Sequence, residues 1–338
     1  MCHNVRSLRE RTRPQDLLKT MDRELSKFIG CLVGTAIGDS LGARRAGSPE
    51  HVEVADLAPR YTDDTAMTIA VAESLVEYKD FHYWHMAERI LKLYEQEPWR
   101  RYGHTLTRVF RLMRNGRLGF GMIDRDLYPE GSFGNGAPTR IAPVGLLYFD
   151  DPAKLRDVAY NCAGITHSHE LGLEGAALQA CSVALAVLAE PKNLKVTEYV
   201  GALQMFAKPS LYQSLLKTII KLLSGEPKRE DVVATLGTGG SSLESVPAAL
   251  YAFLSTRDFK SAVIYAVSLG GEADTIGAMT GAIAGACYGI EGIPSQWRET
   301  VEKREYIELL AKRLWEVKMG INKDSVDDSI GEAALESQ

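Results

Sequence analysis

The sequence contains little cysteine, no excess of basic charge and no long apolar run, and each shortage excludes a class of protein. Its 338 residues include five cysteines, none in CxxC spacing. We therefore expect reduced thiols, without a disulfide framework or a structural zinc site. The net charge of −5 offers no broad basic surface for nucleic acid or an anionic membrane. No uninterrupted apolar run approaches the roughly 18 residues of a membrane span. We expect a cytoplasmic protein with neither nucleic acid nor membrane as a partner.

The two ends of the chain differ in composition from its middle. Residues 1–23 include several arginines but no apolar stretch of the kind found in secretory signals, and residues 320–338 are polar and acidic. We expect a flexible leader over 1–23, a single domain over 24–319 and an acidic tail over 320–338. We further expect the protein to be a monomer.

Helical periodicity dominates the middle of the chain, where apolar residues recur at i, i+3, i+4 and i+7. The strand signal is weak, since its best example is the short alternation HVEVADL at residues 51–57. The pattern predicts an all-α fold of about a dozen helices, a compact orthogonal multi-helix bundle. The strongest helical segments are Thr65–Tyr78, Tyr83–Glu97, Leu173–Leu188, Ser210–Leu223 and Arg304–Val317.

Two adjacent aspartates, Asp63 and Asp64, stand at the start of a predicted apolar helix in the segment RYTDDTAMTIAVAESL. Asp and Thr are good N-cap residues, and a helix N-terminus favours negative charge. One acidic residue there needs no further explanation. Two carboxylates between Thr62 and Thr65 exceed what capping requires.

A second segment, LGGEADTIGAMTGAIAGACYG, places Glu272, Asp274 and Thr275 before another apolar helix. That helix is rich in Gly and Ala, and small residues let helices approach closely, so the two acidic helix starts can meet in space. Hard oxygen ligands without His or Cys favour Mg²⁺, Mn²⁺ or Ca²⁺ over Zn²⁺. On spacing alone, a shared cation site and two independent capping sites are equally good interpretations.

Asp39 lies within the glycine-punctuated segment GCLVGTAIGDSLGA. Glycine is costly inside a helix, so this many glycines indicate close packing or close approach of a ligand. Asp39 itself is either a carboxylate that supports a nearby site or, as we favour, a buried structural acid.

The glycine-rich segment GSFGNGAPTR, from Gly131 to Arg140, offers backbone N–H groups that can wrap an anion, and Phe133 can stack on a base. The alternative is a plain multi-turn loop. In ITHSHELGLEGA, His167 and His169 do not have zinc-protease spacing. His167 is therefore either a ligand contact or a structural histidine.

Together these segments resemble the ADP-ribosylglycohydrolase family. The matching segments span residues 30–289 in family order. They are GCLVGTAIGDSLGA, YTDDTAM, GSFGNGAPTRIAPVGLLY, THSHELGLEGAALQA, ESVPAALYAFL and LGGEADTIGAMTGAIAGACYG.

The resemblance implies an all-α domain with a dinuclear metal cleft, in which two Mg²⁺ ions (or Mn²⁺) hold the distal ribose of ADP-ribose. By position it implies the metal ligands Thr62, Asp63, Asp64, Glu272, Asp274 and Thr275, with Asp63, Asp64 and Asp274 as the catalytic acids. It also implies substrate binding by Gly131, Ser132, Phe133, Gly134, Asn135 and His167.

Two positions depart from the family pattern. Ala46 stands where the family has a flap glutamate, and general acid–base catalysis is typically worth about 10²–10⁴-fold. Glu50 or Glu53 is a possible substitute if the loop folds back. Glu272 stands where the family usually has aspartate, and its longer side chain alters the geometry of a Mg²⁺ site.

The resemblance implies a Mg²⁺-dependent hydrolase that cleaves the N- or O-glycosidic bond of ADP-ribose attached to a protein serine or arginine, or to a small conjugate. Because of Ala46, an ADP-ribose-binding or crystallin-like structural protein with weak or no activity is the alternative. A hydrolase of another nucleotide-linked ribose on the same scaffold is a third hypothesis.

Overall fold

Every regular element in the described part of the chain is a helix, as the periodicity of the apolar residues predicts. The computed structural model describes residues 14–44, 57–58, 60–116, 125, 127–208 and 211–321. These residues form sixteen α-helices and two short 3₁₀ helices, with one isolated β-bridge between Gly134 and Ser241. The all-α prediction is confirmed, with more helices than expected.

The helices follow one another along the chain with mostly short connections. They are α2 (Pro14–Arg44), α3 (Asp63–Tyr78), α4 (Tyr83–Gln96), α5 (His104–Arg114), α6 (Gly136–Thr139), α7 (Ala142–Leu147), α8 (Pro152–Ala163), α9 (Glu170–Leu188), η3 (Pro191–Asn193), α10 (Val196–Phe206), α11 (Leu211–Leu223), α12 (Arg229–Leu236), α13 (Ser242–Leu254), α14 (Phe259–Ser268), α15 (Ala273–Tyr288), η4 (Ile290–Gly292), α16 (Ser295–Thr300) and α17 (Arg304–Met319).

The five strongest helices of the sequence prediction are present as α3, α4, α9, α11 and α17, with ends that differ from the prediction by at most three residues. Helix α2 begins at Pro14, so residues 14–23, which the sequence analysis assigns to a leader, are helical. The weak strand alternation at 51–57 lies outside the described residues except for Leu57, and most of the acidic tail also lies outside them.

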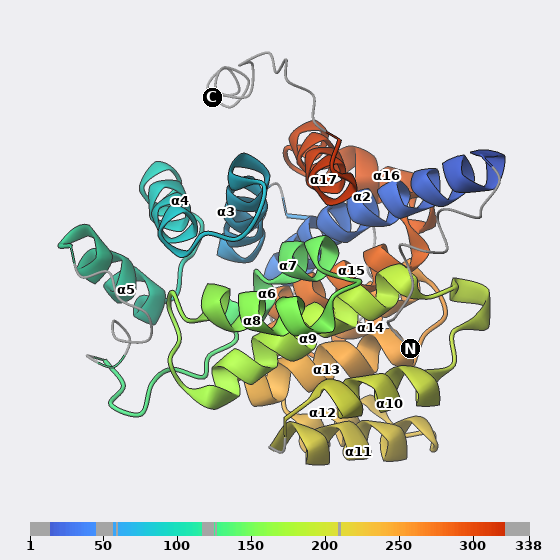
Figure 1. Ribbon diagram of the computed structural model, residues 1–338. Coiled ribbons are helices and arrows are strands. Elements are labelled where there is room, and N and C mark those ends of the chain that lie inside the picture. The colour runs from blue at the N-terminus through green and yellow to red at the C-terminus, as the bar shows by residue number, and fades with distance from the viewer. Residues whose placement is uncertain are drawn as a thin grey trace.

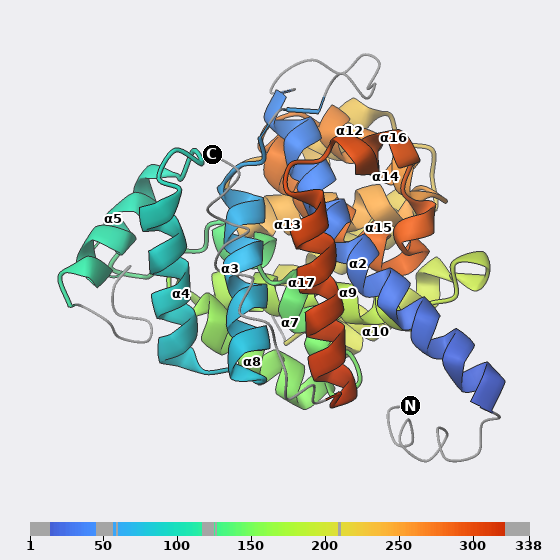
Figure 2. The same ribbon diagram turned by 90° about the horizontal axis from the view of Figure 1, so that it is seen from above.

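Helices α2 and α15 lie side by side through the middle of the molecule (Figures 1 and 2), with α17 and α3 on one side and α9 and α13 on another. Helix α9 has the length and hydropathy of a membrane span, but 78% of its apolar 18-residue stretch is buried inside the protein. This is typical of a central helix in a helical domain. Four cysteines are buried and free, as expected: Cys31, Cys162, Cys181 and Cys287.

Glycines on α2 and α15 face one another at four-residue intervals. A Cβ atom added to Gly34 would clash with the carbonyl oxygen of Gly281, and one added to Gly281 would clash with that of Gly34. The same reciprocal contact joins Gly38 to Gly277. The two helices are antiparallel and touch through their backbones, so the close packing that the glycines of both segments predict is confirmed. The contact places the C-terminal half of α2 beside the N-terminus of α15.

Candidate functional site

Asp39 projects from α2 to the first turn of α3. Its carboxylate accepts hydrogen bonds from the backbone N–H groups of Thr62 and Thr65, at 3.0 Å each, and from the Thr65 hydroxyl at 2.6 Å. The N–H of Asp64 donates to the Thr62 hydroxyl at 3.3 Å. The start of α3 is therefore capped by Asp39 and Thr62. These capping bonds come from Asp39 and Thr62, and the carboxylate of Asp64 accepts from Thr275 instead.

The second acidic helix start lies against the first. The Thr275 hydroxyl on α15 donates to the carboxylate of Asp64 on α3 at 2.8 Å, across 211 residues of sequence. Asp274 lies on the same turn, and its carboxylate accepts from the Thr275 N–H at 3.0 Å. The two segments that the sequence analysis paired by composition are thus neighbours in space.

We call Asp39, Asp63, Asp64 and Asp274 the acidic cluster. Burial raises the pKa of Asp64 well above its usual range, and the charges of the other three aspartates raise it further. Burial and the charge of Asp39 likewise raise the pKa of Asp63 well above its usual range. Burial also raises the pKa of Asp39, to about 6. The charge of Arg101 lowers the pKa of Asp63, but by less than burial, Asp39 and Asp274 raise it.

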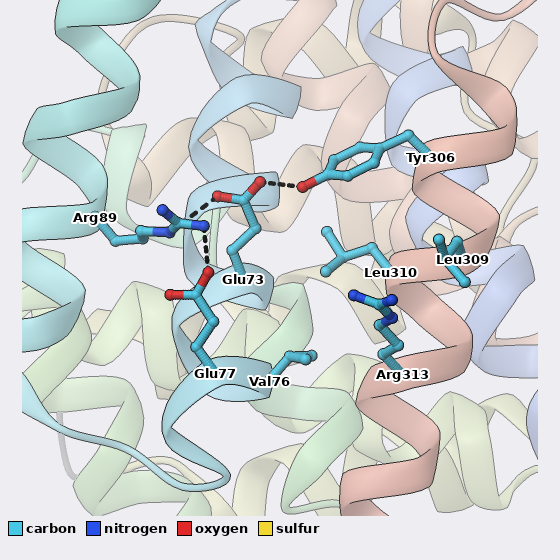
Figure 3. Close-up of a pocket in the computed structure, with 8 residues that line it drawn as sticks. All are labelled: Glu73, Val76, Glu77, Arg89, Tyr306, Leu309, Leu310 and Arg313. Atoms are coloured by element: carbon cyan, nitrogen blue, oxygen red, sulfur yellow. Dashed lines mark hydrogen bonds and ion pairs between the residues drawn. The ribbon is translucent and has the colours of Figure 1, made fainter. Parts of the chain in front are cut away.

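Some acidic side chains elsewhere in the fold have cationic partners, as in a small pocket between α3, α4 and α17 (Figure 3). There Glu73 accepts from the Tyr306 hydroxyl, and Arg89 pairs with both Glu73 and Glu77. Glu73 lies ten residues beyond Asp63, about 15 Å along the helix at 1.5 Å per residue. The pocket is therefore neutralised by the protein itself, and the acidic cluster is a separate feature.

A buried ion-pair network supports the segment before Asp63. Arg100 donates to the carbonyl oxygen of Tyr61 at 3.0 Å and stacks on its ring at 3.9 Å. The same guanidinium pairs with Glu302 at 2.6 Å and with Glu97 at 2.8 Å. The Tyr61 N–H donates to Glu302 at 3.0 Å. These contacts hold both backbone polar groups of Tyr61 and so fix where the chain enters α3.

The oxygen atoms of the acidic cluster and its neighbouring threonines are of the kind that binds a hard divalent cation. Carboxylate and threonine hydroxyl oxygens are suitable ligands for Mg²⁺ or Mn²⁺. A cation would also offset the repulsion that raises the carboxyl pKa values of Asp63 and Asp64. Within the described ranges, however, no three Asp, Glu, His or Cys side chains already stand in the arrangement of a finished metal site. The dinuclear cleft implied by the resemblance is therefore not shown.

Glu272 occupies a more open position than the acidic cluster. It is the N-cap residue of α15 but makes no side-chain capping hydrogen bond, and it is exposed. Burial and the charge of Asp274 raise the pKa of Glu272, while an interaction with the Asn135 side chain acts in the opposite direction. Its carboxylate therefore lies between the acidic cluster and the glycine-rich loop.

The glycine-rich loop, which we define as residues 131–135, is held against the N-terminus of α13. The Asn135 N–H donates to the Gly240 carbonyl oxygen at 3.0 Å. The carbonyl oxygen of Phe133 accepts from the Ser242 N–H at 3.0 Å and from the Ser242 hydroxyl at 2.8 Å. Glu272 donates its N–H to Thr238 at 2.8 Å, so one segment, 238–242, contacts both the loop and the second acidic helix start.

Gly131 begins the loop in a conformation that other residues rarely adopt. Its φ is +86°, in the left-handed region, and an added Cβ would clash with Ser168 and the backbone of His169. On the other side of the loop, Gly172 lets the first turn of α9 approach Ser132 and Phe133, whose backbone atoms lie 2.9 and 3.1 Å from where its Cβ would be. Because neither glycine has a Cβ atom, the loop can pack closely against the start of α9.

His167 packs against the loop, and Phe133 is its one aromatic residue. His167 is buried, and its Nε2 atom lies 3.5 Å from where a Cβ of Gly134 would be. Phe133 is 42% exposed, and its ring centroid lies 5.1 Å from that of His169 at an interplanar angle of 58°. Phe133 and His169 thus present an aromatic surface beside the loop. Ala46, Glu50 and Glu53 lie outside the described residues.

Substitution of Ser242 tests whether its hydrogen bonds to Phe133 hold the glycine-rich loop in place. Replacing it with alanine removes the hydroxyl bond to Phe133, which is worth about 1 kcal/mol, without touching the acidic cluster. We expect Ser242→Ala to raise the Kd for ADP-ribose several-fold and to leave kcat within about twofold. Calorimetry and initial rates separate the two effects. Ser255→Ala, at the other end of α13, is the matched control. Equal losses of ADP-ribose affinity in both variants would contradict the role of Ser242 in holding the loop.

Sequence reasoning missed the residues that act through tertiary contacts. Asp39 is not among these residues, since it is buried as expected and its hydrogen bonds hold the first turn of α3. Ser242 and Arg100 were not singled out, because a serine at a helix start and an arginine in a polar stretch have no distinctive local pattern. Their roles depend on partners more than a hundred residues away, which are Phe133 for Ser242 and Glu302 for Arg100.

Comparison with known proteins agrees with the geometry. The family model described as ADP-ribosylglycohydrolase matches residues 20–322. The chain is 34% identical to the ADP-ribosylhydrolase ARH3 of Mus musculus, over 87% of this chain and 92% of that protein. It is 25% identical to the ADP-ribosylarginine hydrolase Tri1 of Pseudomonas putida (strain GB-1), over 88% of this chain and 80% of that protein.

A solved structure described as an ADP-ribosylglycohydrolase-related protein complex has the same fold. Its TM-score is 0.69 at 27% sequence identity, and the match covers 88% of this chain and 100% of that one. The family is metal-dependent, in keeping with the donor chemistry of the acidic cluster. The chain thus belongs to the ADP-ribosylglycohydrolase family and is a hydrolase that acts on glycosyl bonds.

Proposed function

We propose that the protein hydrolyses the glycosidic bond between ADP-ribose and a protein side chain, in a reaction that depends on two Mg²⁺ ions. The observation that carries the proposal is the contact of Thr275 with Asp64 at 2.8 Å, which joins two acidic helix starts from distant parts of the chain. Mn²⁺ is the expected substitute for Mg²⁺, because it accepts the same oxygen ligands.

The chain's own residues supply binding and orientation. Thr62, Asp63 and Asp64 on α3, with Glu272, Asp274 and Thr275 at the start of α15, would hold the ions and the distal ribose between the two helices. When bound, the two ions supply Lewis-acid activation of a water molecule and orientation of the ribose hydroxyls. Asp39, by fixing the first turn of α3, keeps Asp63 and Asp64 directed into this site.

The glycine-rich loop would bind the diphosphate through backbone N–H groups, since glycines allow an anion to approach the chain closely. Phe133 lies exposed beside the loop, where it can stack on adenine. The loop and the second acidic helix start both contact segment 238–242, so one ADP-ribose can reach both.

The protein residue to which ADP-ribose is attached remains to be identified. One relative is described as an ADP-ribosylarginine hydrolase and others as the ADP-ribosylhydrolase ARH3. Identity is higher to the ARH3 proteins, so we propose serine-linked ADP-ribose as the first substrate to test and arginine-linked ADP-ribose as the second.

Metal removal tests the proposal. Incubated with serine-linked or arginine-linked ADP-ribosyl protein, the enzyme should release free ADP-ribose in Mg²⁺, lose activity in EDTA and regain it when Mg²⁺ is added in excess. Release of ADP-ribose that EDTA does not reduce would refute the proposed dependence on Mg²⁺. No release from either substrate, while a relative is active in parallel, would refute the hydrolase, and ADP-ribose binding without release would identify a binding protein instead.

A further inference from the structure

A chain of polar groups leads from a buried arginine to His167. Arg140 is fully buried, and its guanidinium donates to the carbonyl oxygens of Gly136 and Cys162 at 3.1 Å each. The same group donates to the Thr166 hydroxyl oxygen at 2.7 Å. That hydroxyl lies 2.7 Å from Nδ1 of His167. Three buried polar side chains are therefore linked in sequence: Arg140, Thr166 and His167.

The direction of the hydrogen bonds follows from the arginine. A guanidinium has only donors, so the Thr166 hydroxyl oxygen must accept from Arg140. The hydroxyl then has one proton of its own to donate, and Nδ1 of His167 is the acceptor within reach. The positive charge of Arg140 favours the same direction, because it disfavours a proton on the ring nitrogen nearest to it.

The ring is neutral at ordinary pH. Burial, and then the charge of Arg140, lower the pKa of His167 to about 3. A neutral imidazole carries one proton. With Nδ1 accepting from Thr166, that proton is on Nε2, the atom that faces Gly134 in the loop.

We propose that Arg140 and Thr166 are positioning residues that fix His167 in the Nε2–H form, so that it presents a hydrogen-bond donor without a charge to the ligand of the glycine-rich loop. The inference rests on the proposed function for the identity of that ligand, which offers phosphate and ribose oxygens as acceptors. The tautomer itself is a property of the free protein. In the Nδ1–H form, Nε2 would present a lone pair to those oxygens and repel them.

The tautomer can be read directly from the free protein by long-range ¹H–¹⁵N correlation spectroscopy at neutral pH, with His167→Gln identifying the His167 signals. We expect the wild type to show a protonated Nε2 and an unprotonated Nδ1. Thr166→Ser keeps the hydroxyl and should keep that pattern. Thr166→Val keeps the shape but removes the hydroxyl, and it should give a mixture of tautomers or the Nδ1–H form.

Binding supplies the second readout. Thr166→Val should raise the Kd for ADP-ribose about five- to tenfold, and Thr166→Ser should leave it within about twofold. An Nδ1–H form in the wild type, or an unchanged tautomer in Thr166→Val, would overturn the inference. If the wild type shows the Nε2–H form but binds no ADP-ribose, the proposed function fails while the positioning of His167 by Thr166 stands.

Discussion

Replacing Asp64 with asparagine should reduce turnover by at least about 10³-fold, because it removes a charged ligand of the proposed Mg²⁺ site, whose contribution would be several kcal/mol. Asparagine keeps an oxygen that can accept from the Thr275 hydroxyl, so the contact between α3 and α15 survives. The substitution also removes one of four mutually repelling carboxylates. We therefore expect the metal-free variant to be at least as stable as the metal-free wild type.

The measurement pairs activity with thermal unfolding in the presence and absence of Mg²⁺. Wild type should be stabilised by Mg²⁺, since a ligand that binds only the folded state raises its stability, and Asp64→Asn should lose most of that shift. Asp151→Asn is the matched control, because Asp151 caps α8 and asparagine caps a helix equally well. Full activity in Asp64→Asn would contradict the role of the acidic cluster.

Replacing Gly281 with alanine should destabilise the protein by about 3 kcal/mol, because overpacking a close contact is costly. The added methyl would meet the carbonyl oxygen of Gly34 on the facing helix, and backbone cannot move aside as a side chain can. Separating α2 from α15 would also shift Asp39 relative to Asp274, so Mg²⁺ binding should weaken together with stability.

Gly201 on α10 provides a control of the opposite sign. A Cβ added there meets nothing within 4 Å, so Gly201→Ala should stabilise its helix by up to about 1 kcal/mol. Denaturant unfolding of both variants measures the difference. If Gly281→Ala were as stable as Gly201→Ala, the backbone contact between α2 and α15 would not be a determinant of the fold.

Much of the fold follows from local pattern. The apolar stripe and the following proline predict a helix from Tyr83 to Glu97, and α4 runs from Tyr83 to Gln96. The start of α2 at Pro14 differs from the expected leader, although Leu17, Met21 and Leu25 already have helical spacing. Met21 and Leu25 pack against the hydrophobic core, so tertiary contacts support this part of the helix.

The candidate site divides in the same way. Residue type and spacing favour a cation site at Asp63 and Asp274 no more than two capping sites, and only the family resemblance favours the cation site. The contribution of Asp39 was not predictable in detail, since it depends on which helix start lies next to α2. The same is true of Ser242, which contacts the glycine-rich loop across 109 residues of sequence.

The central claim is that carboxylates from α3 and α15 share divalent ions, and a crystal structure grown with Mn²⁺ and ADP-ribose tests it most directly. Anomalous scattering locates Mn²⁺ without reference to the protein chain. We expect two manganese peaks between Asp64 and Asp274, with the distal ribose bound to them. Manganese bound elsewhere, or ADP-ribose bound with no peak near these two residues, would contradict it.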